Sequence, residues 1–66
     1  MKNKYNSGLF VQSNVTGERG VVFKGFMEIW GLMAVFWFSN SNEYEMVNEE
    51  ELSIIGEFNE QGKTIY

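Results

Sequence analysis

The sequence predicts an all-β fold, a small antiparallel barrel of five strands with one short helical turn before the last strand. Short runs of β-favouring residues are separated by turns of glycine and asparagine, and the chain contains no proline. The 66 residues make a single domain, with a core of about residues 8–58 between polar termini. Six Phe, three Tyr and two Trp supply the apolar bulk, and the stretch "AVFWFSN" (34–40) is apolar on both faces of a strand.

The first two predicted strands flank a glycine turn. "GLFVQS" (8–13) is rich in β-favouring residues, and "GVVFKGF" (20–26) begins with two adjacent valines after its glycine. Gly17 and Gly20 bracket the predicted turn, because glycine permits the positive φ angles that hairpin turns require.

The central apolar stretch predicts the third strand, from Leu32 to Ser39. "MEIWG" (27–31) either extends the second strand or connects it to the third. A helix over 26–38 is the alternative, since apolar residues also recur there at helical spacing. Gly25 and Gly31 would each cost a helix interior about 1 kcal/mol relative to alanine. A helix that is apolar on every side also needs a larger protein to bury it, so strands are the better interpretation.

The last third of the chain predicts a turn, a strand, a helical turn and a final strand. "NSNE" (40–43) is predicted as the turn and "YEMV" (44–47) as the fourth strand. "NEEEL" (48–52) predicts one helical turn, capped by Asn48 and rich in glutamates near the positive end of its dipole. "SIIGEF" (53–58) is the fifth strand, and "NEQGKTIY" (59–66) is a polar tail or a final turn.

Two segments resemble the SH3-like small β-barrels, especially their KOW-type and Tudor-like variants. "FVQSNVTGERGVV" is a strand, a GxxG turn and a strand, and "VFWFSNSNEYEMVNEEELSII" is a strand, a polar turn, a strand, an acidic helical turn and a final strand. The resemblance covers about residues 8–55. It implies a barrel that binds peptides or methylated cations through aromatic residues between its loops.

The sequence has more aromatic side chains than the interior of a small barrel can hold, which raises the question of which face of the third strand is buried. If the strand leads into the turn at Asn40 as such barrels arrange it, Ala34, Phe36 and Phe38 point inward, and Val35 and Trp37 point outward. The interior of a small barrel has room for only one set. The other set forms a second small core under a loop, an exposed patch that binds a partner, or the interface of a homodimer.

The predicted contact patch is aromatic with an acidic rim. Trp and Tyr are favoured as interface anchors, and the glutamates gather in the last third of the chain, where they would steer a basic partner. A solvated surface that keeps the protein soluble is the simpler explanation of these charges. The predicted binding residues are Trp30, Val35, Trp37, Tyr44, Glu49, Glu50 and Glu51.

Composition argues against catalysis, cofactors and metal binding. The sequence has no Cys, no His and no Asp, so it lacks thiolate nucleophiles, the usual general base and the usual zinc ligands. We therefore expect no enzyme activity, no cofactor and no metal, and a protein-interaction module instead. The net charge of −4 makes nucleic acid an unlikely partner. A KOW-like nucleic-acid-binding domain that uses Arg19, Lys24 and the rings remains the alternative.

The longest nearly apolar stretch, 26–38, is too short to span a membrane and contains Glu28. "MKNKYNSG" has no apolar run behind its lysines, so it does not read as a secretory signal, and a cytoplasmic protein is expected. A small acidic domain of this composition resembles proteins that phages and mobile elements encode, which bind and modulate a host protein.

Overall fold

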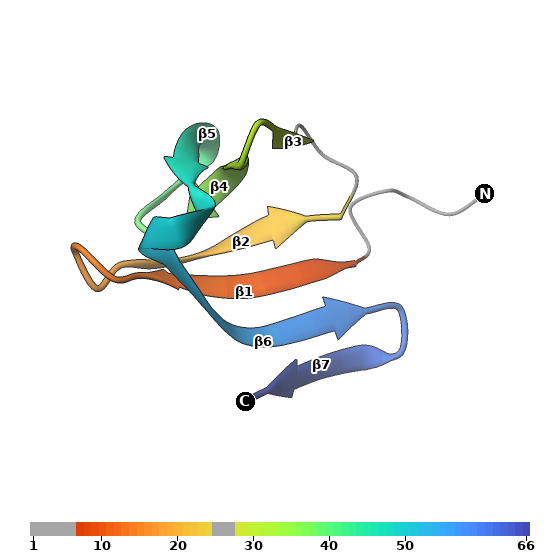
Figure 1. Cartoon of the computed structure of the whole chain (residues 1–66). Coiled ribbons are helices and arrows are strands. Elements are labelled where there is room, and N and C mark those ends of the chain that lie inside the picture. Colours follow the sequence, from red (N-terminus) through yellow and green to blue (C-terminus); the bar gives the residue numbers. More distant parts are fainter. Residues whose placement is uncertain (1–6, 25–27) are drawn as a thin grey trace.

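The computed structural model describes residues 7–24 and 28–66, which form one antiparallel sheet (Figure 1). The strands pair in the order β3-β4-β2-β1-β6-β7, and β5 pairs with β4. The elements are β1 (Gly8–Ser13), β2 (Arg19–Phe23), β3 (Glu28–Ile29), β4 (Leu32–Trp37), β5 (Asn40–Asn48), the 3₁₀ turn η2 (Glu49–Glu51), β6 (Leu52–Asn59) and β7 (Gly62–Ile65).

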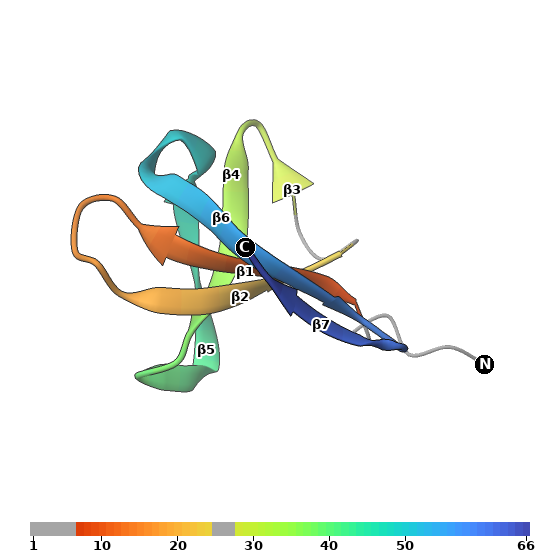
Figure 2. The ribbon, with the colours of Figure 1, turned by 90° about the horizontal axis from the view of Figure 1, so that it is seen from below.

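The all-β prediction is confirmed, but the five-stranded barrel is not. The described residues form seven strands, and their pairings do not close the sheet into a barrel. The sheet is strongly bent instead. Figure 2 shows β4 and β5 running across the direction of β1, β2, β6 and β7. The bend lets one face of the sheet enclose a small core.

Several predicted boundaries are confirmed and several are wrong. β1 and the helical turn lie where the sequence places them, and the Asn48 side chain caps η2 by accepting a hydrogen bond from the Glu50 amide at 3.0 Å. The helical alternative for 26–38 is wrong, because β3 and β4 form a hairpin there; residues 25–27 lie outside the described part of the chain. The second strand ends at Phe23 within the described residues, and residues 40–43, predicted as a turn, begin β5.

The C-terminal segment adds a strand to the sheet. β7 pairs with β6 from Gly56 to Asn59, where a tail or turn was expected. The Tyr66 amide donates to the Ile55 carbonyl, and a hydrogen bond to the Glu57 carboxylate raises the pKa of the Tyr66 phenol above its usual value. The end of the chain is thus tied back to β6.

The two faces of the sheet differ in the size of their side chains. One face, here called the Val face, holds the sealed core, whose cluster of buried side chains is Val11, Val22, Val35 and Val47. The other, here called the Phe face, carries Phe10, Phe23, Phe36 and Phe58, whose rings touch in pairs with centroids 5.2 to 5.9 Å apart. None of the phenylalanines that the structure describes is fully buried.

The prediction that Val35 points outward and Phe36 inward is therefore wrong. Val35 is 0% exposed in the centre of the core, whereas Phe38 is 59% exposed. Ala34 is buried, as expected, although it alternates with Val35. The buried cluster consists of valines, and the rings of the Phe face lie half-buried on the other side of the sheet.

Candidate functional site

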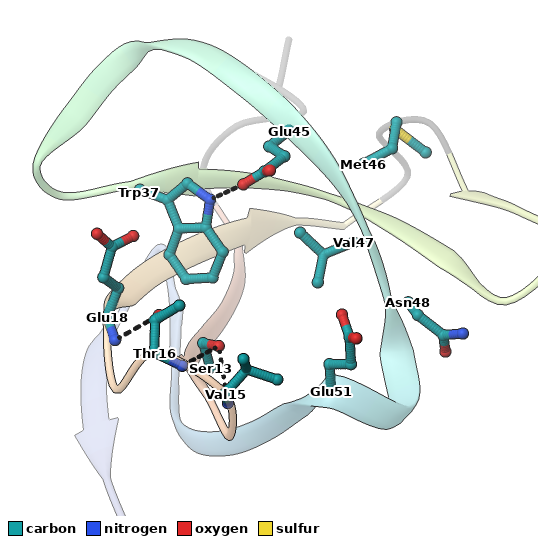
Figure 3. A pocket seen from close by; sticks show the side chains of 10 residues that line it. All are labelled: Ser13, Val15, Thr16, Glu18, Trp37, Glu45, Met46, Val47, Asn48 and Glu51. Atoms are coloured by element: carbon teal, nitrogen blue, oxygen red, sulfur yellow. Dashed lines mark hydrogen bonds between the residues drawn. The ribbon is translucent and has the colours of Figure 1, made fainter.

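A hollow of about 210 Å³ opens beside Trp37, between the β1–β2 loop and β5 (Figure 3). Its floor is part of the Val face, and its walls carry hydroxyls and carboxylates. The lining residues are Ser13, Val15, Thr16, Glu18, Trp37, Glu45, Met46, Val47, Asn48 and Glu51.

The indole of Trp37 forms one wall of this hollow. Trp37 is half-buried and packs against the sealed core, so its ring has a fixed position. Its Nε1–H donates to Glu45 Oε1 at 2.6 Å, a charge-assisted hydrogen bond that holds the carboxylate beside the ring. The ring and the carboxylate come from facing strands, β4 and β5, so the hairpin itself sets their geometry.

The β1–β2 loop forms the opposite wall and is built by local hydrogen bonds. Ser13 Oγ accepts from the amides of Val15 and Thr16, both at 3.1 Å, and Thr16 Oγ1 accepts from the Glu18 amide at 3.1 Å. Such side-chain bonds to the backbone favour a compact turn. Gly17 completes it with a φ of +81°, which glycine adopts at little cost.

The loop is also tied to η2. The Asn14 amide donates to the Glu51 carbonyl at 2.7 Å, and Ser53 Oγ donates to Asn14 Oδ1 at 2.6 Å. These bonds hold the backbone of Glu51 at the rim of the hollow. Figure 3 shows the Glu51 carboxylate directed into the space that Trp37 bounds from the other side.

The hollow combines negative charge with an aromatic ring. Glu18, Glu45 and Glu51 are among its lining residues, and no Lys or Arg is. In Figure 3 the Glu45 and Glu51 carboxylates lie by the hollow, and the Glu18 carboxylate lies on the other side of the indole. A cation gains from nearby carboxylates and from the electron-rich indole, the best cation–π partner among the aromatic side chains. Within residues 7–24 and 28–66, no group of three carboxylates is arranged to hold a metal ion. The arrangement suits a cationic side chain.

The structure brings together part of the predicted patch and separates the rest. Trp37 and Glu51 line the same hollow, while Glu50 is exposed on η2 beside it. Tyr44 lies on the Phe face, where its ring meets Phe36 at 5.9 Å, and Val35 is sealed in the core. Val35 therefore reaches no partner in the folded protein.

Trp30 lies at the tip of the β3–β4 hairpin, beside η2. The Glu49 amide donates to the carbonyl of Gly31 at 2.9 Å, so this tip adjoins the acidic turn. Trp30 is 96% exposed and has a φ of +47°, and Gly31 has a φ of +76°. Two positive φ angles in a two-residue loop define a type I′ turn, which favours Asn-Gly.

Replacing Trp30 with asparagine is expected to stabilise the fold by about 1 kcal/mol, because asparagine tolerates the left-handed conformation that costs tryptophan this much. Thermal unfolding should show a midpoint raised by about 4–8 °C. An unchanged or lower midpoint would contradict the turn geometry.

Sequence reasoning missed Glu18 and Glu45, the other two glutamates that line the hollow. Glu45 shares a face with Trp37 because the register of β4 and β5 shifts between Val35 and Trp37, so that Glu45 pairs with Val35. A regular hairpin closed by the same turn at Phe38 and Ser39 would put Glu45 on the other face, so the sequence pattern does not reveal the pair. Glu18 comes from a loop, and no periodic pattern in the sequence points to it.

The cations of the alternative prediction are separated from this hollow. Arg19 Nε donates to Gln12 Oε1 at 3.1 Å at the start of β2, and Lys24 is exposed just after β2 ends. Arg19 and Gln12 are direct partners across β1 and β2, on the side of the sheet that carries Phe10.

Comparisons with known proteins identify no relative of this chain. In the part of the chain that the structure describes, no helix is long and apolar enough to cross a membrane. No protein-family model, no curated protein and no solved structure matches the chain.

Proposed function

We propose that this protein is a non-enzymatic interaction module that binds a basic segment of a partner protein. The hollow beside Trp37 accepts a lysine or arginine side chain, and η2 forms its acidic rim. The observation that carries the proposal is a space of about 210 Å³ that is lined by one indole and by Glu18, Glu45 and Glu51, with no Lys or Arg beside them. That volume suits the end of one long side chain.

Trp30 and Glu49 supply a second contact in this proposal. They adjoin each other through the hydrogen bond between Glu49 and Gly31, and η2 connects them to the hollow. A basic segment would thus lie along η2, with one cation in the hollow and an apolar side chain against Trp30. Exposed tryptophans are frequent anchors of this kind.

We also propose that the fold is related to the SH3-like barrels. This proposal is supported by the order β5-β4-β2-β1-β6 and by the 3₁₀ turn that precedes β6. Peptide binding between loops and the edge of the sheet is the mode that such a relationship implies. In a small acidic protein of the type that phages and mobile elements encode, this surface would bind and modulate a host protein.

Fluorescence titration with lysine-rich and arginine-rich octapeptides tests the proposal. At low salt, Glu51→Gln and Glu45→Gln are each expected to weaken binding about two- to fivefold, the range for one exposed ion pair. Glu60→Gln removes the same charge from the β6–β7 turn and is the matched control, which should leave affinity unchanged. Equal effects of Glu51→Gln and Glu60→Gln would reduce the interaction to net charge and overturn the proposal.

The same titration with single-stranded oligonucleotides tests the nucleic-acid alternative. Binding that is lost in Arg19→Glu and that falls steeply with salt would favour the KOW-like alternative. Binding of the basic peptides alone favours the interaction module.

A further inference from the structure

The Phe face carries a second hollow, larger and more apolar than the first. It measures about 400 Å³ and lies among β2, β4, the β4–β5 turn and the start of β5. Its lining residues are Val21, Phe23, Phe36, Phe38 and Ser41. Phe38 forms its rim, 59% exposed in the turn, with its ring centroid 6.5 Å from that of Phe10.

We propose that the Phe face is the interface of a homodimer, in which Phe38 of each copy fills the Phe-face hollow of the other. In this arrangement each copy offers both the hollow and an exposed Phe38, so the contact is isologous about a two-fold axis. Such an isologous contact, with the same patch on both copies, is the commonest interface of homodimers.

The size of the sealed core supports a second copy as the occupant. The buried apolar side chains of the described residues are four valines and one alanine, and a chain of 66 residues buries a smaller fraction of its surface than a larger domain does. Small domains usually add disulfides, a metal or oligomerisation. The sequence has no cysteine, and residues 7–24 and 28–66 hold no group of metal ligands. Oligomerisation would bury the exposed Phe38 and complete the burial of the half-buried rings beside it.

The Phe face has the composition of an interface core; a standard interface buries roughly 800 Å² per partner around such a core. Phenylalanine rings dominate the centre of this face, and fully buried aromatic residues are what interface cores enrich.

The distribution of charge also favours this contact. Each chain carries a net charge of −4, so two copies repel unless their acidic surfaces lie apart. Glu45 pairs with Val35 and therefore shares the side of the Val face, whereas Tyr44 contacts Phe36 on the other side. In a dimer that contacts through the Phe face, Glu45 and the Trp37 hollow face away from the other copy. The dimer and the proposed peptide site are therefore compatible and independent.

Analytical ultracentrifugation over a concentration series tests this proposal. The wild-type chain is expected to shift from monomer to dimer with rising concentration. Phe38→Glu should weaken the association by about 30-fold or more, the effect of losing one hot-spot residue. Ile54→Glu is the matched control, because Ile54 is 53% exposed and pairs with Val11 on the opposite side of the sheet. It should dimerise like the wild type.

Cysteine cross-linking gives a second readout that does not depend on affinity. Since the chain has no cysteine, Ser41→Cys places a single thiol at the rim of the Phe-face hollow and should form a disulfide-linked dimer on oxidation. Thr64→Cys on β7 is the control and should cross-link far less. A wild type that stays monomeric at millimolar concentration, or equal dimerisation of Phe38→Glu, would overturn the proposal. A labelled single-stranded oligonucleotide or a lysine-free apolar peptide that binds the monomer and is lost in Phe38→Glu would also overturn it.

Discussion

Replacing Val35 with aspartate is expected to unfold the protein at 25 °C. Val35 is 0% exposed and packs in one cluster with Val11, Val22 and Val47. An unpaired buried carboxylate costs several kcal/mol, and the lost burial of valine adds about 1.5–3 kcal/mol. A domain of this length has a free energy of unfolding of only about 3–10 kcal/mol. Far-UV circular dichroism and amide NMR dispersion should both show an unfolded chain.

Two further variants test whether the expected unfolding comes from burying a charge at position 35. Ile54→Asp introduces the same charge at a position that is 53% exposed, and it should stay folded with a loss below about 1 kcal/mol. Val35→Thr keeps the shape of the side chain but buries a hydroxyl, which costs about 1–3 kcal/mol. A folded Val35→Asp with near-native stability would mean that Val35 faces solvent, as its place in the sequence suggested.

The orientation of β4 shows what period-two reasoning can and cannot decide. Alternation correctly assigns Val35 and Trp37 to one face and Phe36 to the other. It does not say which face is sealed, because both are apolar, and a strand that is apolar on both sides specifies its orientation weakly. The expectation that the larger rings lie inside was wrong because the bent sheet encloses a small volume. The predicted turn began at Asn40, whereas Phe38 and Ser39 form the observed turn. The prediction therefore treated Phe38 as an inward-pointing strand residue, although it lies in the turn.

Local signals predicted some elements well and others poorly. Asn48 followed by three glutamates encodes η2 through a side-chain cap, so sequence reasoning found it. β3 and β7 are short and carry polar residues, and only their pairing with β4 and β6 makes them strands. The same holds for the Trp37 hollow. Trp37 and the acidic turn could be predicted from residue type, whereas Glu18 and Glu45 join them only through loop geometry and strand register.

Gly20 is the second position where a single change should have a large effect. A Cβ at Gly20 would lie 2.5 Å from the Phe36 carbonyl oxygen and 3.0 Å from Val35 Cγ1. The sequence placed Gly20 at the boundary between the predicted turn and the second strand, and the structure places it inside β2, buried directly across from Trp37. Glycine is required there because the backbones of β2 and β4 approach closely, a known use of glycine within strands.

The pairing that Gly20 permits joins the two parts of the bent sheet. Only two residue pairs connect β2 to β4 in the described sheet, Gly20 with Trp37 and Val21 with Phe36, and the Phe38 amide adds a hydrogen bond to the Arg19 carbonyl. A methyl group between these strands pushes against backbone atoms, which cannot rotate away as a side chain can. The Trp37 hollow depends on the same junction, because its walls come from both parts of the sheet.

Gly20→Ala is therefore expected to lower the free energy of unfolding by about 3 kcal/mol or more, the upper range for overpacking a well-filled core. Urea unfolding measures this loss directly. Gly17→Ala is the matched control, because a Cβ there meets no atom within 4 Å. Its only expected cost is about 1 kcal/mol of backbone strain, since alanine must adopt the φ of +81°. If both substitutions cost the same, β2 and β4 do not approach as closely as described. If only Gly20→Ala is severe, and it also abolishes peptide binding at the Trp37 hollow, the close junction of the two strands is what holds both the fold and the site.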